Sequence, residues 1–148
     1  MKLKQIIFLL LFAGMIACQT DNSSKLEYLN PEGNSNRPFS EAVQVGNLLF
    51  TSGNLGRDPE TRQLPEGGIA AETKQCLENI KTVLEKYGSS MDEVVKVTVM
   101  LADIDEWASM NEVYVTFFPN NKPARSAFGG NGLAGGARVE IECIAYVK

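Results

Sequence analysis

The sequence predicts an α+β fold with the element order β-β-α-β-α-β, in which two helices cover one face of a single sheet. Two segments carry apolar residues at helical spacing, a strand that is apolar at almost every position lies between them, and the last strand alternates with a period of two. The chain has 148 residues, which is enough for one modest domain with a single core.

The N-terminus predicts an export signal. Lys2 and Lys4 precede an apolar run, Ile6 to Ala17. This run is shorter than the roughly 20 residues that span a bilayer. The run ends in Met-Ile-Ala-Cys, which resembles a bacterial lipobox, where cleavage before the cysteine leaves that residue acylated. The alternative is a plain secretory peptide with Cys18 incidental.

The chain therefore divides into three segments. We assign residues 1–17 to the signal peptide, 18–36 to a lipid-anchored polar tether and 37–148 to the folded domain. The lipid is then the only membrane attachment, and the domain lies on the periplasmic side of the cell envelope. Gln19 stands where an aspartate commonly retains lipoproteins in the inner membrane, which favours the outer membrane.

Composition excludes several kinds of partner. Loss of Lys2 and Lys4 leaves 12 of the 14 basic residues against 18 acidic ones, with no arginine-rich stripe, so nucleic acid is not expected as a partner. The absence of histidine removes the commonest general base and metal ligand. Cys76 and Cys143 resemble no zinc spacing, and we expect two inert core thiols; the alternative is a disulfide formed after export.

The first half of the domain predicts a hairpin, a loop and a helix. The β-prone runs 42–45 and 48–52 flank Gly46-Asn47, which suits a tight turn. Gly, Pro and Asp throughout 54–68 indicate a loop. From 69 to 87, apolar residues recur every three or four positions, and Gly88 is a natural helix C-cap.

The second half predicts strand, helix and strand. Residues 94–102 form a strand expected to be covered on both faces. A helix follows over 105–118, ended by Pro119, and its expected inward residues are Trp107, Met110, Val113, Tyr114, Phe117 and Phe118. Along the last strand, 137–147, Val139, Ile141, Cys143 and Ala145 alternate with Arg138, Glu140, Glu142, Ile144 and Tyr146.

Two helices can cover only one face of this sheet. The other face carries apolar residues as well, among them Ile144 and Tyr146. We therefore expect self-association through the uncovered face.

One arginine stands in an unusual setting. In "KPARSAF", Lys122 to Phe128, Arg125 lies between a proline and small residues, where a core strand would carry valine. A guanidinium can fork onto the carboxylate of a small organic acid. A surface position or an internal ion pair with Glu140 or Glu142 is the alternative, and the pattern alone leaves both open.

Four motifs in order resemble the Rid family of reactive intermediate imine deaminases, also called the YjgF family. They are "LLFTSGNLG", "MNEVYVTFFP", "PARSAF" and "ARVEIECIA", and the match runs from Arg37 to Lys148. The resemblance implies a chorismate-mutase-like sandwich with a single mixed sheet, and a homotrimer with clefts between subunits. It also implies hydrolysis of imines and enamines of small 2-amino acids, such as 2-aminoacrylate and 2-iminobutyrate, to 2-keto acids and ammonia without metal or organic cofactor.

The resemblance also implies site residues. Arg125 matches the arginine that binds the substrate carboxylate, and Glu140 the acid associated with the attacking water. Ser52 and Gly53 fall where the family supplies a hydroxyl and a backbone donor, and Asn111 matches the family's cleft asparagine.

The chain departs from the family pattern at three places. Phe39 replaces a frequent tyrosine and keeps only an aromatic wall, while Ala127 replaces a frequent cysteine whose contact is largely through backbone. The glycine-rich segment Gly129 to Gly136 replaces a leucine-proline turn, and a looser cleft rim is expected. The competing hypothesis is a non-catalytic envelope lipoprotein that binds small carboxylates through Arg125.

Overall fold

The computed structural model describes residues 25–30 and 37–148. The predicted signal peptide, Cys18 and most of the predicted tether lie outside these residues. The strands are β1 (Leu26–Leu29), β2 (Ala42–Val45), β3 (Leu48–Thr51), β4 (Asn54–Leu55), β5 (Val94–Leu101), β6 (Ala124–Gly129) and β7 (Val139–Tyr146). The α-helices of the described part are α2 (Gly68–Lys86) and α3 (Trp107–Tyr114).

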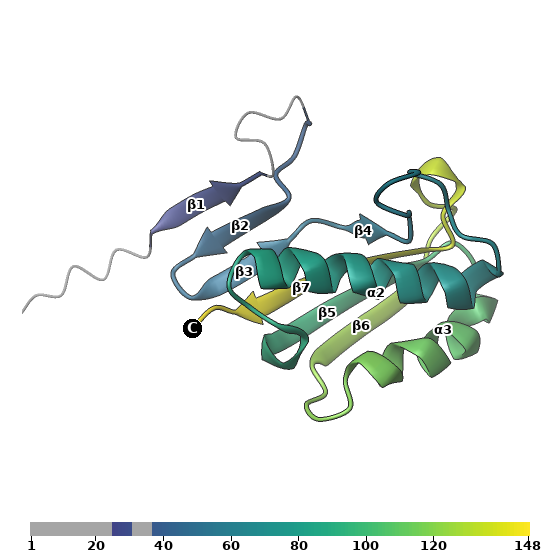
Figure 1. Ribbon diagram of the computed structural model, residues 1–148. Coiled ribbons are helices and arrows are strands. Elements are labelled where there is room, and N and C mark those ends of the chain that lie inside the picture. Colours follow the sequence, from purple (N-terminus) through teal and green to yellow (C-terminus); the bar gives the residue numbers. More distant parts are fainter. Residues whose placement is uncertain (1–24, 31–36) are drawn as a thin grey trace, which may run out of the picture.

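The strands form one mixed sheet with two helices, as predicted. Its order is β1-β2-β3-β7-β5-β6, and the short β4 also pairs with β7. β5 and β6 run parallel because α3 crosses over between them, and the other pairs are antiparallel. Both helices pack on the same side of the sheet (Figure 1).

The core lies between α2 and the middle strands. The apolar stripe of α2 is buried: Thr73, Cys76, Leu77, Ile80, Val83 and Leu84. It meets the buried side of β7, where Val139, Ile141, Cys143 and Ala145 alternate with more exposed residues as predicted. Gly88 has a φ of 79°, and the Ser89 N–H donates to the Leu84 carbonyl at 2.8 Å, so the predicted helix cap is confirmed.

Two strands were not anticipated from the sequence. β1 lies within the segment assigned to the tether and pairs with β2 at the edge of the sheet. It has only four residues, Leu-Glu-Tyr-Leu, which is too short a run to give a clear strand pattern. β6 contains Arg125, and its Arg, Ser, Ala and Gly residues give a weak strand signal.

The second helix is shorter than predicted, and Trp107, its first residue, does not point into the core. α3 is flanked by single 3-10 turns at Ile104–Glu106 and Val115–Phe117. Met110, Tyr114 and Phe118 are buried as expected. Trp107, however, was expected inward and is 40% exposed. It opens the helix at the margin of the sheet, where its ring lies near Arg125 instead of in the core.

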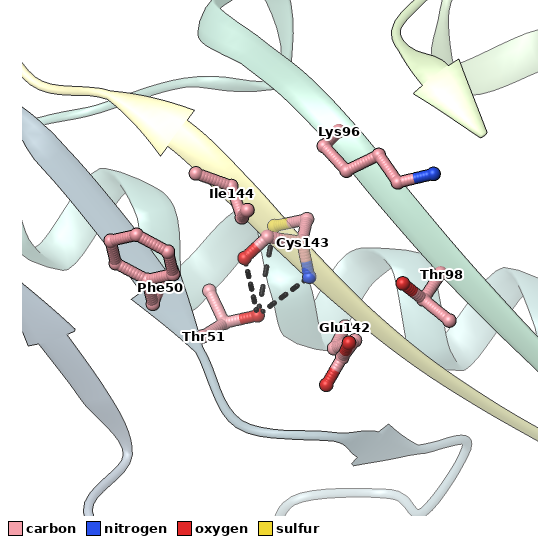
Figure 2. A pocket seen from close by; sticks show the side chains of 7 residues that line it. All are labelled: Phe50, Thr51, Lys96, Thr98, Glu142, Cys143 and Ile144. Atoms are coloured by element: carbon pink, nitrogen blue, oxygen red, sulfur yellow. Dashed lines mark hydrogen bonds between the residues drawn. The ribbon is translucent and has the colours of Figure 1, made fainter. Parts of the chain in front are cut away.

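The sheet face opposite the helices is open in the single chain. Figure 2 shows Phe50, Thr98, Glu142 and Ile144 on three adjacent strands of this face, around a shallow hollow of about 190 Å³. On β5, Val97, Val99 and Leu101 are buried, whereas the residues between them are only half-buried. One face of β5 is therefore covered by this chain, and cover on the second face stays a prediction.

The two cysteines of the folded domain lie in its core. Cys76 and Cys143 are buried and free, which confirms the prediction of core thiols over a disulfide. Within residues 25–30 and 37–148, no helix is both long and apolar enough to cross a membrane. The described residues also contain no cluster of three or more Cys, Asp or Glu side chains that could bind a metal ion.

Candidate active site

Arg125 is held by side chains from α3. On β6 it pairs with Val97, whose side chain faces the helices. The Arg125 Nη1 donates to Asn111 Oδ1 at 2.9 Å, and its Cζ lies 4.4 Å from the centre of the Tyr114 ring. The Trp107 ring centre is 5.4 Å away. The guanidinium is thus fixed by one amide and two aromatic rings.

These contacts leave the charge of Arg125 uncompensated. No ion pair among the described residues includes Arg125, so the alternative of an internal pair with Glu140 or Glu142 is wrong. A cavity of about 300 Å³ opens beside the guanidinium, with Asn111, Tyr114 and Pro123 among its lining residues. A half-buried cation with free N–H groups beside a cavity suits a small carboxylate.

Tyr114 contacts the Arg125 guanidinium through its neutral aromatic ring and does not supply a negative charge. Burial raises the pKa of the Tyr114 hydroxyl, while the Arg125 charge opposes this rise. The hydroxyl is therefore neutral at neutral pH. It has no hydrogen-bond partner in the described part of the chain.

Glu140 lies on the opposite face of the sheet. On β7 it stands between the buried Val139 and Ile141, so its side chain points to the open face. Its carboxylate lies directly over Gly53: a Cβ added to Gly53 would be 2.9 Å from Glu140 Cδ and would overlap the carboxylate oxygen. Glycine at position 53 is what lets this carboxylate approach the backbone.

Ser52 and Phe39 lie near the same strand junction. The Ser52 hydroxyl donates to the Ser40 carbonyl at 2.6 Å, so it is engaged with the backbone as in a turn. Phe39 is 57% exposed and lines, together with Gly53, a second cavity of about 320 Å³. Its role as an aromatic wall of the substrate cleft stays a prediction.

The predicted site residues thus form two groups. Arg125 and Asn111 are in contact, and Ala127 follows two positions along β6 on the same side, packed against the core. Glu140 and Gly53 are in contact, with Ser52 and Phe39 beside them. Register places Arg125 opposite Val97 and Glu140 opposite Met100, on opposite faces of β5, so a single chain does not bring the two groups together.

Sequence reasoning missed the role of two aromatic residues. Both were assigned to the core, where Tyr114 does lie and Trp107 does not, but the contact of both rings with Arg125 was not predicted. The signal was present in their spacing, because Trp107, Asn111 and Tyr114 follow at steps of four and three and share one face of a helix. What the sequence did not reveal was that Arg125 lies opposite that face.

The fold and these two groups of residues define a class of small α+β proteins with a strand arginine on one face of the sheet and a strand glutamate on the other. The chain belongs to the family described as Endoribonuclease L-PSP, whose profile matches residues 31–147. The chain is 44% identical over 108 residues to the human 2-iminobutanoate/2-iminopropanoate deaminase, covering 73% of this chain and 79% of that protein.

Two further relatives agree. A RutC family protein of Pyrococcus abyssi is 46% identical over 109 residues, which are 74% of this chain and 86% of the relative. The crystal structure of the Escherichia coli YjgF gene product superposes with a TM-score of 0.72 at 32% identity, covering 77% of this chain and 91% of that one. The resemblance stated from the sequence motifs is confirmed at the level of family and fold.

Proposed function

We propose that this protein is an imine and enamine deaminase that hydrolyses small 2-imino acids to 2-keto acids and ammonia. The observation that carries the proposal is the uncompensated Arg125 guanidinium, held by Asn111 at 2.9 Å beside a cavity. The 2-iminobutanoate/2-iminopropanoate deaminases of human and mouse, each 44% identical to this chain, support the substrate class.

The chemistry needs few groups. The carbon of a protonated imine is already electrophilic, so hydrolysis needs a positioned water, a group to take its proton and a proton for the leaving nitrogen. Arg125 uses one N–H for Asn111 and keeps others for the substrate carboxylate. Glu140 takes one proton from the attacking water as its oxygen bonds to the imine carbon, and it returns that proton to the nitrogen of the resulting carbinolamine. The C–N bond then breaks as the C=O bond forms, ammonia leaves, and the hydroxyl proton passes to Glu140 and from there to ammonia or solvent.

The complete site is then shared between chains. Because Arg125 and Glu140 face opposite sides of one sheet, they can act on one substrate only if they come from different copies. We propose a homotrimer in which Arg125, Asn111 and Ala127 of one copy meet Glu140, Gly53, Ser52 and Phe39 of the next. The apolar residues that the single chain leaves partly open on the sheet face opposite the helices, Phe50, Met100 and Ile144, support such an assembly.

Turnover tests the function. 2-Iminobutyrate, generated in situ by an amino-acid oxidase, should disappear faster in the presence of the protein, and both Arg125→Ala and Glu140→Ala should abolish the acceleration. Glu142→Gln is the matched control, because Glu142 lies two residues further along the same strand face, and it should keep activity. Saturable binding of 2-keto acids without any imine turnover would contradict the proposal.

We also propose that the chain is exported and lipid-anchored at Cys18. The support is the sequence alone: two lysines, a short apolar run and Met-Ile-Ala-Cys. Expression with a radiolabelled fatty acid should label the wild type and leave Cys18→Ser unlabelled. Equal labelling of both, or labelling of neither, would contradict the anchor.

A further inference from the structure

The cavity that holds Phe39 and Gly53 is lined by three arginines. Arg37, Arg57 and Arg62 all border its volume of about 320 Å³, together with Asn79 and Thr82 of α2. Arg37 precedes β2, whereas Arg57 and Arg62 belong to the loop after β4, which lies near α2 in Figure 1. Segments from two parts of the chain thus bring cations to one hollow.

Among the residues that line the hollow, one carboxylate stands against three arginines. Glu41 is the one carboxylate that lines the cavity, and its Oε2 already accepts from Lys86 Nζ at 2.7 Å and from the Tyr87 hydroxyl at 2.6 Å. No ion pair in the described part of the chain includes Arg37, Arg57 or Arg62. Three like charges around one hollow favour an anionic ligand.

The three arginine side chains differ in how far they are held by hydrogen bonds to the protein. The Arg57 Nη1 donates to the Arg62 carbonyl at 2.8 Å, and its Nη2 to the Gly135 carbonyl at 3.0 Å. Arg57 therefore ties the loop to the glycine-rich segment before β7. Arg37 and Arg62 are exposed, and their guanidinium groups can turn to a ligand.

This hollow adjoins the proposed site. Gly53 lines it and at the same time contacts the Glu140 carboxylate. A substrate whose imine carbon lies near Glu140 can therefore extend its side chain over Gly53 toward the arginines. Planar guanidinium groups bind carboxylates in a forked geometry.

We propose that the substrates of this deaminase are 2-imino acids with a second carboxylate on the side chain, held by Arg37 and Arg62. This inference rests on the proposed function. Arg125 binds the carboxylate next to the imine carbon, and the arginine-lined hollow of the neighbouring copy binds the distal one. The imines formed by oxidation of acidic amino acids have this chemistry.

Two substrates test the inference in one assay. We expect 2-iminoglutarate, generated by a glutamate oxidase, to have a kcat/KM at least equal to that of 2-iminobutyrate. In the double variant Arg37→Gln/Arg62→Gln, kcat/KM for 2-iminoglutarate should fall by roughly tenfold or more, since bonds to charged groups are lost, while 2-iminobutyrate turnover stays within about twofold of the wild type. Lys74→Gln removes one exposed positive charge of α2 that does not line the hollow, and it should change neither rate.

Binding of the stable keto acids gives a second readout. The double variant should weaken calorimetric binding of 2-oxoglutarate and leave that of 2-oxobutyrate unchanged. Equal effects on both substrates, or none on 2-iminoglutarate, would overturn the inference while 2-iminobutyrate turnover still supports the deaminase. If the wild type hydrolyses neither imine, the deaminase function fails and the inference with it.

Discussion

The side chains that hold Arg125 in position are all neutral. The Tyr114 and Trp107 rings and the Asn111 amide fix the guanidinium without cancelling its charge. An acidic residue at the same distance would hold the side chain equally well but would compete with a substrate carboxylate. The identity of residue 111 therefore decides whether Arg125 can bind an anion.

Asn111→Asp tests this directly. The new carboxylate would stand about where Asn111 Oδ1 accepts from Arg125 at 2.9 Å, so the fold should persist while kcat/KM for 2-iminobutyrate falls tenfold or more, because a bond to a charged group is worth about 1.5–3 kcal/mol. Asn111→Ala should cause a smaller loss, mainly in KM. Ser109→Ala, at an exposed position of the same helix, is the control. Wild-type kinetics in Asn111→Asp would contradict the carboxylate-binding role of Arg125.

The two core thiols should resist modification. Burial raises the pKa of the Cys143 thiol from 9.0 to about 11, and burial also raises the pKa of the Cys76 thiol. The thiolate is the reactive form, so iodoacetamide at pH 8 should label neither residue in the folded protein and both after denaturation, as peptide mass mapping can show. Rapid labelling of either thiol in the native protein would contradict their burial.

The raised pKa of Cys143 also makes the stability of the fold depend on pH. The contribution of the neutral thiol to the free energy of unfolding is fully present below about pH 9 and is lost as the pH rises toward 11.

At the scale of elements, periodicity determined what could be predicted. α2, β5 and β7 bury long regular patterns, so their place and their inward residues were predictable. β6 was not, because its residues have little β propensity and it forms by pairing with β5. The candidate residues themselves came from motifs, but their division between the two faces of the sheet depends on register, which no single segment specifies.

The packing of α2 on the sheet depends on Gly56. A Cβ added there would be 2.3 Å from the Glu72 carbonyl oxygen and 2.8 Å from Glu72 Cα, both in the backbone of α2. Gly56→Ala should therefore push α2 away and lower stability by about 1–3 kcal/mol. Thermal unfolding at one fixed protein concentration measures the change. Gly130→Ala, where an added Cβ would be no closer than 3.6 Å to its nearest neighbours, should unfold close to the wild type; equal Tm values for both variants would contradict the role of Gly56.

At the scale of the whole molecule, the separation of Arg125 and Glu140 predicts complementation. Arg125→Ala and Glu140→Ala should each be inactive alone. After the two variants are denatured together and refolded, about a quarter of the interfaces in a randomly mixed closed ring pair an intact arginine with an intact glutamate. Activity should return to about that fraction, and light scattering should give about three times the chain mass. No recovery by refolded mixed trimers, or a monomeric wild type, would contradict a site built from two chains.

If Cys18 is acylated as proposed, the edge position of β1 limits the distance between the domain and the membrane. Only seven residues lie between Cys18 and Leu26, the first residue of this strand, and a fully extended chain covers at most about 28 Å over that stretch. With acylation at Cys18, the rim of the sheet stays within one bilayer thickness of the lipid headgroups. An anchor at Cys18, as proposed above, would therefore keep the domain close to the bilayer surface.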